Sequence, residues 1–161
     1  MTTALSLEEV KSRQQKTWSS GDYGKIAWIT VPLADDLCEA AGLRPGSAVL
    51  DVATGTGHVA LAAARRFCAV TGVDYVPALL QEARARAAAE RLPVEFREAD
   101  AEDLPYPDAS FDYVLSAIGV MFTADHQRAA DELLRVCRSG GVVGLASWTP
   151  AGFIGPNWIF P

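Results

Sequence analysis

The chain has 161 residues, of which 50% are hydrophobic and 21% are charged, with 13 glycines and 9 prolines. This composition excludes a disordered, collagen-like or coiled-coil protein and is typical of a single globular domain, residues 1–161. The formal net charge is -6, and no basic run is longer than Arg65–Arg66. Binding to nucleic acid is therefore not expected, because it needs a basic face.

The three cysteines, Cys38, Cys68 and Cys137, are widely spaced among apolar residues. They indicate reduced thiols rather than a disulfide framework, and no metal site is expected. The N-terminus lacks the basic and apolar pattern of a secretory signal. The uncharged stretch 139–161 contains three prolines, so we expect no membrane span and a cytoplasmic protein.

Helix and strand signals alternate along the chain. Ser6 and Glu9 form a capping-box pattern that predicts a helix through about Trp18, before the loop SSGDYGK. Further helices are predicted at about 30–41, 57–67, 77–91 and 125–138. Strands are predicted at 48–53, 69–74, around Val94 and Phe96, in the first half of 111–122, and at 140–148. Five strands joined by crossovers predict an α/β fold, a doubly wound and mainly parallel sheet covered on both faces.

The turn after the first strand reads DVATGTGHVA, residues 51–60. From Gly55 it fits the dinucleotide pattern G-x-G-x-x-[G/A], and Asp74 follows at the distance of an acid that binds ribose hydroxyls. However, Asp51 stands just before the glycines, where a carboxylate would repel a pyrophosphate and attract an ammonium or sulfonium. Asp100 and Glu102 add carboxylates after the third strand. The pattern favours a cationic nucleoside, S-adenosylmethionine, over NAD.

The sequence resembles the class I S-adenosylmethionine-dependent methyltransferases, in particular the small-molecule branch similar to the enzymes of ubiquinone and menaquinone biosynthesis. VLDVATGTG, VTGVDYV, EADAEDLPY and FDYVLSAIGVMF resemble four family segments in the expected order. The resemblance implies methyl transfer to a small-molecule acceptor, with S-adenosylhomocysteine as the product. It also implies cofactor contacts from Asp51, Ala53, Gly55, Gly57, Asp74, Tyr75, Asp100, Ala101 and Ser116, and a contact from Tyr23 in a mobile N-terminal cover.

In the roles that the resemblance implies, Asp51 meets the methionine ammonium, Asp74 binds both ribose hydroxyls and Tyr75 lies against adenine. Asp100 accepts a hydrogen bond from the adenine amino group, Ala101 offers its backbone N–H, and Ser116 borders the methyl group. Residues 1–42 are expected to form the helical cover, 43–148 the Rossmann-like core and 149–161 an apolar tail.

Three features depart from the family pattern. Ala53 stands where a glycine is usual, and Ser139 replaces a proline. The family sheet has the strand order 3-2-1-4-5-7-6, and this chain stops after the fifth strand, so its order is expected to be 3-2-1-4-5 without the terminal antiparallel hairpin. The fifth strand would then be an open apolar edge. We therefore expect either that the 161 residues are a truncated form or that a partner or a second copy of the chain covers this edge.

Several alternatives remain open from the sequence. His58 and His126 suit capping or surface roles as well as that of a general base, and no catalytic residue is named, because methyl transfer needs no nucleophile on the protein. Three aromatic residues suit either a substrate pocket or core packing: Trp148, Phe153 and Trp158. The alternative functions are a non-catalytic S-adenosylmethionine-binding or partner subunit and an NAD-dependent oxidoreductase.

Overall fold

The computed structural model describes residues 6–20, 28–148 and 158–160. Their elements are α1 (Leu7–Ser19), the short 3₁₀ helix η1 (Trp28–Thr30), α3 (Val31–Ala40), β1 (Ala48–Val52), α4 (His58–Arg65), β2 (Ala69–Asp74), α5 (Pro77–Glu90), β3 (Val94–Glu98), β4 (Phe111–Ala117), η2 (Val120–Phe122), α6 (His126–Val136), β5 (Cys137–Ala146) and β6 (Trp158–Phe160). Tyr23 and Phe153 lie outside the described residues.

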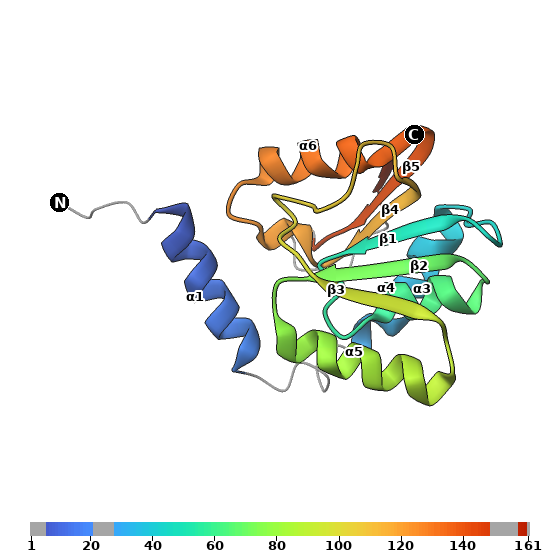
Figure 1. Ribbon diagram of the computed structural model, residues 1–161, viewed down its shortest axis with the longest axis horizontal. Helices are drawn as coiled ribbons and strands as arrows, with labels where there is room; N and C mark the ends of the chain where they lie inside the picture. The colour runs from blue at the N-terminus through green and yellow to red at the C-terminus, as the bar shows by residue number, and fades with distance from the viewer. Residues whose placement is uncertain (1–5, 21–27, 149–157, 161) are drawn as a thin grey trace.

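The strands form one sheet in the order β3-β2-β1-β4-β5-β6. Strands β1 to β5 run parallel, which confirms the predicted α/β class, the parallel sheet and the order 3-2-1-4-5. Figure 1 shows α6 on one face of the sheet and α3, α4 and α5 on the other. Because β1 lies at the centre, covered on both faces, four of its five residues are buried.

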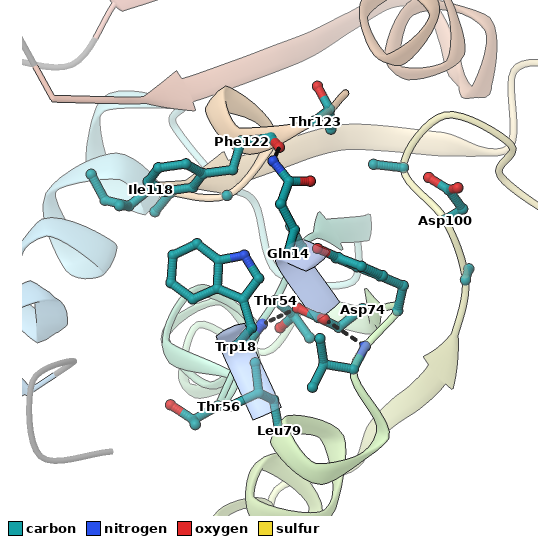
Figure 2. A pocket seen from close by; sticks show the side chains of 18 of the residues that line it. Gln14, Trp18, Thr54, Thr56, Asp74, Leu79, Asp100, Ile118, Phe122 and Thr123 are labelled. Carbon is teal, nitrogen blue, oxygen red and sulfur yellow. Dashed lines mark hydrogen bonds between the residues drawn. The ribbon is translucent and has the colours of Figure 1, made fainter. Parts of the chain in front are cut away.

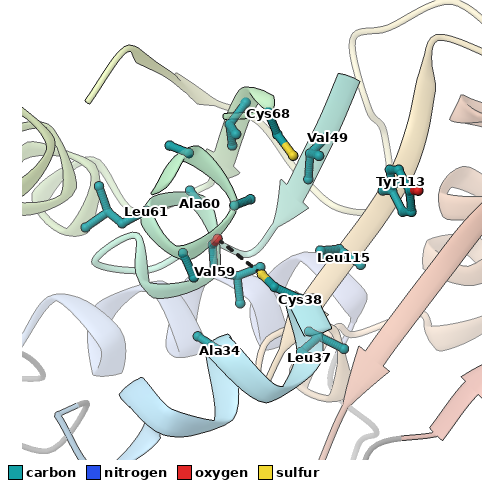
Figure 3. Close-up of a cluster of buried hydrophobic side chains, with 14 of the residues drawn as sticks. Ala34, Leu37, Cys38, Val49, Val59, Ala60, Leu61, Cys68, Tyr113 and Leu115 are labelled. Carbon is teal, nitrogen blue, oxygen red and sulfur yellow. Dashed lines mark hydrogen bonds between the residues drawn. The ribbon is translucent and has the colours of Figure 1, made fainter. Parts of the chain in front are cut away.

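Each face of the sheet has its own core. On the side of α3 and α4, the six residues Val59–Ala64 of α4 are all buried, and the four alanines among them let the helix lie close to the sheet. Figure 3 shows Cys38 of α3 in this core, where its thiol donates to the carbonyl of Val59 at 3.9 Å. Burial raises the pKa of Cys38 to about 12, so this thiol stays protonated.

The sequence prediction was wrong at the fifth strand in two respects. β5 begins at Cys137, directly after α6, and not at Gly140. Its register with β4 shifts between Cys137 and Val142, and the two glycines lie within this irregular part of the strand. A side chain at Gly141 would meet the Asp112 carbonyl at 2.7 Å. The expected open edge of β5 is also covered, since β6 pairs with it antiparallel over three residues.

Helix α1 begins as its sequence predicts. The hydroxyl of Ser6 accepts a hydrogen bond from the backbone N–H of Glu9, whose carboxylate accepts one from the N–H of Ser6. Figure 1 shows α1 apart from both helical layers, beside the end of the sheet. None of the helices described here is long and apolar enough to cross a membrane.

Candidate cofactor site

The chain turns sharply between β1 and α4, in residues 53–57. Backbone φ angles are positive at Ala53 (54°), Gly55 (54°) and Gly57 (86°). The N–H of Thr54 donates to the carbonyl of Val73 at 2.8 Å, which joins the turn to the end of β2. The backbone at this point therefore follows a left-handed path that favours glycine at two positions and strains the alanine at the third.

The two glycines of the turn serve different purposes. A side chain at Gly57 would meet Ala83 and the ring of Phe96 at 3.2 Å, so this glycine permits close packing of the turn on α5 and β3. A Cβ atom added at Gly55 would meet no protein atom within 4 Å, and Gly55 lines a cavity. The space beside Gly55 is therefore available to a ligand that approaches the backbone.

Asp51 lies behind the turn and not in the cavity. Its side chain is buried, and one carboxylate oxygen accepts from the Thr54 hydroxyl at 2.5 Å and from the Ala60 N–H, at the start of α4, at 2.9 Å. Burial raises the pKa of Asp51 to about 7, although these hydrogen bonds oppose the shift. In this structure Asp51 holds the turn against the first residues of α4.

Asp74 is the last residue of β2; it lines the cavity and is hydrogen-bonded to the glycine turn. Its carboxylate accepts from the Gly55 N–H at 2.8 Å through one oxygen and from the Val76 N–H at 2.9 Å through the other. Burial raises the pKa of this carboxyl group, and the backbone hydrogen bonds oppose the shift. Each oxygen retains a lone pair, so Asp74 can also accept from two hydroxyl groups of a ligand.

The loop after β3 supplies two more carboxylates. Asp100 accepts from the Glu102 N–H at 2.9 Å, and Lys11 of α1 lies 2.6 Å from one carboxylate oxygen of each acid. The other oxygen of Glu102, which is only 3% exposed, accepts from the N–H groups of Ala124 and Asp125 at 2.9 and 3.0 Å. Lys11 and Glu102 thus connect α1, this loop and the segment before α6.

A cavity of about 300 Å³ lies among these segments, at the carboxyl ends of the strands (Figure 2). Six of the predicted site residues line it, namely Ala53, Gly55, Asp74, Tyr75, Asp100 and Ala101. Three others, Asp51, Gly57 and Ser116, do not line it. Tyr23, the predicted cover residue, lies outside the described residues.

Ser116 supports a wall of the cavity from behind. Its buried hydroxyl donates to the Val52 carbonyl at 2.7 Å and accepts from the Val120 N–H at 3.2 Å. The wall passes so close to the turn that a side chain at Gly119 would meet the Cβ of Ala53 at 2.6 Å. Ile118, which lies between Ser116 and Gly119 in the sequence, lines the cavity. Its backbone φ is 53°, and a positive φ is unusual for a β-branched residue.

The cavity also has members that the sequence reasoning missed. Figure 2 shows Gln14 and Trp18 of α1 beside Phe122, and the Gln14 amide donates to the Phe122 carbonyl at 2.7 Å. The rings of Trp18 and Phe122 lie 5.0 Å apart. Lys11, Gln14, Gln15 and Trp18 follow the spacing i, i+3, i+4, i+7 of one helix face, and this was the available signal.

The charge of the cavity suits a cation. The charged side chains among the described lining residues are those of Asp74, Asp100, Glu102 and Lys11, so carboxylates are in excess. His58 also lines the cavity, and burial, with Arg86 and Arg65 nearby, lowers its pKa to about 4, so it is neutral at pH 7. Among the described residues, no group of three or more possible ligands could hold a metal ion.

The strand order and the position of the cavity define a Rossmann-like α/β domain with a ligand site beside β1, where the strand order reverses. Residues 50–145, more than half of the chain, match the family described as methyltransferase domain. The chain therefore belongs to this family, that of the class I S-adenosylmethionine-dependent methyltransferases.

Several known proteins are similar to the chain, and two of those named here are methyltransferases by their names. An uncharacterised protein of Mycobacterium tuberculosis is 47% identical over 155 residues, which are 96% of this chain and 57% of that protein. The demethylmenaquinone methyltransferase of Deinococcus radiodurans is 44% identical over 104 residues, 63% of this chain and 43% of that protein. The crystal structure of a putative methyltransferase from Bacillus halodurans, 32% identical, has a TM-score of 0.68 and covers 72% of this chain and 51% of its own. The chain spans about half the length of the curated relatives it matches.

Proposed function

We propose that the chain binds S-adenosylmethionine in this cavity and transfers its methyl group to a small, uncharged acceptor. The observation that carries the proposal is the hydrogen bond from the Gly55 N–H to Asp74 at 2.8 Å. It joins the carboxylate suited to ribose hydroxyls to the glycine that leaves open space for a ligand. The family match favours S-adenosylmethionine over NAD as this ligand.

In the proposed complex, Asp74 accepts from the ribose hydroxyls. Asp100 accepts from the adenine amino group, and Ala101 and Tyr75 border the base. The backbone at Ala53 and Gly55 lies along the methionine part, and the buried Asp51 supports that backbone through Thr54 and Ala60. The excess of carboxylates among the described lining residues compensates the positive charge of a sulfonium.

When bound, S-adenosylmethionine would supply a methyl group on a sulfonium, so that the acceptor bonds to the methyl carbon in line with the breaking carbon–sulfur bond and S-adenosylhomocysteine leaves. The protein then has to hold the two reactants in contact and exclude water, and no protein nucleophile takes part. Trp18, Phe122 and Trp148 suit this purpose, because they add large apolar surfaces to the cavity wall. Where a proton must leave the acceptor, the neutral His58 is the imidazole on the described wall.

The acceptor that fits this cavity is apolar and uncharged. Away from the carboxylates, the described lining residues carry no charge: Trp18, Thr30, Ala117, Ile118, Gly119, Phe122 and Trp148. A charged acceptor would lose its hydration here without gaining a partner. The name of the Deinococcus relative specifies demethylmenaquinone, which is an acceptor of this apolar kind.

Calorimetric titration with S-adenosylhomocysteine, beside NADH, tests the proposal. We expect saturable binding of S-adenosylhomocysteine only. Asp74→Asn should weaken it by about 2 kcal/mol, roughly 30-fold, because a carboxylate acceptor for the ribose is lost. Asp36→Asn is the matched control, since Asp36 is exposed on α3, and should bind as the wild type does. Binding of NADH alone, or no effect of Asp74→Asn in a folded protein, would contradict the proposal.

A further inference from the structure

Helix α1 covers the cavity without belonging to either hydrophobic core. None of its residues is buried. One helix face, which includes Lys11, Gln14, Gln15 and Trp18, contacts the rest of the protein. Gln15 donates to the Tyr75 carbonyl at 2.7 Å, and Gln14 donates to that of Phe122. Because α1 contributes no residue to either core, these polar contacts and the ring contact of Trp18 contribute to its position.

Lys11 makes the charged contact of this face. Its ammonium lies between Asp100 and Glu102, at 2.6 Å from one oxygen of each. Burial works against the charged form of Lys11, but the hydrogen bonds to both carboxylates outweigh it and raise the pKa of the ammonium. The contact is therefore present throughout the neutral pH range, and because it is partly exposed, salt screens it.

The same contact fixes the side chain of Asp100. One oxygen of Asp100 is held by the Glu102 N–H at 2.9 Å, and the other by Lys11. Without Lys11, the carboxylates of Asp100 and Glu102 would face each other uncompensated, and Asp100, 38% exposed in its side chain, would be free to turn toward solvent. Asp100 is also the residue that the proposed function assigns to the adenine amino group.

We propose that Lys11 is a positioning residue for the cofactor, which couples closure of α1 over the cavity to the orientation of Asp100. This inference rests on the proposed function. When Lys11 reaches Asp100 and Glu102, α1 holds Gln14 and Trp18 over the cavity and Asp100 faces the adenine end. The bound cofactor leaves only after this contact opens, so Lys11 slows its release.

The dissociation rate of S-adenosylhomocysteine, measured by stopped-flow displacement on the whole chain, tests this coupling. Lys11→Met keeps the length of the side chain and removes its charge, and we expect release at least 10-fold faster. Lys16→Met, which removes the same charge from an exposed position of α1, should change the rate less than twofold. Lys11→Arg should restore most of the slow release, which a purely steric role of Lys11 would not predict.

Two further experiments test whether the effect of Lys11 on cofactor release comes from its ion pair with Glu102. Glu102→Gln keeps an oxygen for the Ala124 and Asp125 N–H groups but loses the charge facing Lys11. Lys11→Met and Glu102→Gln each break the ion pair between these two residues. The variant that carries both substitutions should therefore release the cofactor no more than about twofold faster than Lys11→Met alone. Raising the salt concentration should speed release from the wild type and leave Lys11→Met nearly unchanged.

Hydrogen exchange of α1 in the ligand-free protein keeps the test independent of the cofactor. We expect the amides of residues 9–19 to exchange at least 10-fold faster in Lys11→Met than in Lys16→Met. Equal exchange in the two variants would overturn the proposal, whether or not the protein binds S-adenosylhomocysteine. Equal release rates in wild type and Lys11→Met would also overturn it, whereas a wild type that binds no S-adenosylhomocysteine contradicts the proposed function itself.

Discussion

At the scale of single residues, Ala53 shows how closely the glycine turn is packed. The family pattern usually has a glycine at this position, and Ala53 adds one methyl group to it. In the structure, Ala53 has a φ of 54°, a conformation that costs an alanine about 1–2 kcal/mol. Its methyl group uses space that Gly119 leaves open, because side chains at both positions would come within 2.6 Å.

Ala53→Gly should therefore raise the free energy of unfolding by about 0.5 kcal/mol, since relief of the backbone exceeds the entropy that glycine gains in the unfolded chain. Urea denaturation measures this change. Gly119→Ala, its counterpart across the contact, should destabilise the protein by 2 kcal/mol or more, roughly the cost of overpacking. A loss of more than about 1 kcal/mol in Ala53→Gly would show that the packing of the methyl group dominates.

Asp51 links stability to pH. Its pKa is raised to about 7 in the folded protein by burial, against an ordinary value of 3.8. Between these two values the folded state holds a proton that the unfolded state has released, so the free energy of unfolding falls as the pH rises through this window.

Asp51→Asn should remove this contribution. Between about pH 4 and 7, the free energy of unfolding of the wild type should fall relative to that of the variant, and the two slopes should differ by at most about 1.4 kcal/mol per pH unit for this one proton. The contribution is absent from the variant, because the neutral amide still accepts from the Ala60 N–H and does not titrate. Urea denaturation at several pH values measures both slopes, and identical slopes would mean that Asp51 is ionised across the window.

At the scale of elements, the edge of β5 depends on a short partner. The sequence predicts an open apolar edge, whereas the structure pairs Val143, Gly144 and Leu145 with the three residues of β6. Such a short antiparallel pairing is weak, because few backbone hydrogen bonds and little area support it. Strand β5 is thus protected from other chains only while β6 stays in place.

Ile159→Pro should displace β6, because proline fixes the backbone φ and is disfavoured at the centre of a paired strand. We expect the variant to form dimers or larger assemblies through the exposed edge of β5 at concentrations where the wild type does not. Size-exclusion chromatography with light scattering measures the mass of each. Ile159→Val, which does not fix the backbone φ, is the control, and a monomeric Ile159→Pro protein would show that β6 is not needed to protect the edge.

At the scale of the whole molecule, the cavity joins parts of the chain that are far apart in sequence. Its walls come from α1, the turn after β1, the end of β2, the loop after β3 and the segment after β4. A ligand bound here contacts all of them at once. Binding should therefore stabilise the folded protein as a unit and oppose the separate opening of any one wall.

S-adenosylhomocysteine at 100 times its dissociation constant should add about 2.7 kcal/mol to the stability of the protein. For a chain of this length the melting temperature should rise by roughly 5–10 °C, measured by differential scanning fluorimetry. Asp74→Asn should lose most of this shift at the same ligand concentration. Equal shifts in Asp74→Asn and the wild type would place the ligand away from this cavity.

Much of the site could be predicted because its signals are local. Asp74, Gly55 and Asp100 stand directly at strand ends, where any parallel sheet brings residues to one edge, and all of them line the cavity. The capping box of α1 and the alternation of helices and strands are equally local. These patterns in the sequence determined the α/β class, the parallel sheet and the end of the sheet at which the cavity lies, because each depends on neighbouring residues and the chirality of the chain.

Only the tertiary structure decided which side chains face the cavity. Asp51 and Asp74 both adjoin the glycine turn, yet packing of α4 turns Asp51 inward onto Thr54 and Ala60 while Asp74 borders the cavity. Lys11 lies 89 residues before Asp100, and no local pattern specifies that pair. The pairing of β6 with β5 is likewise set by contacts across the fold. Such features depend on the relative placement of whole elements, which the packing of the two cores determines and which no short stretch of sequence encodes.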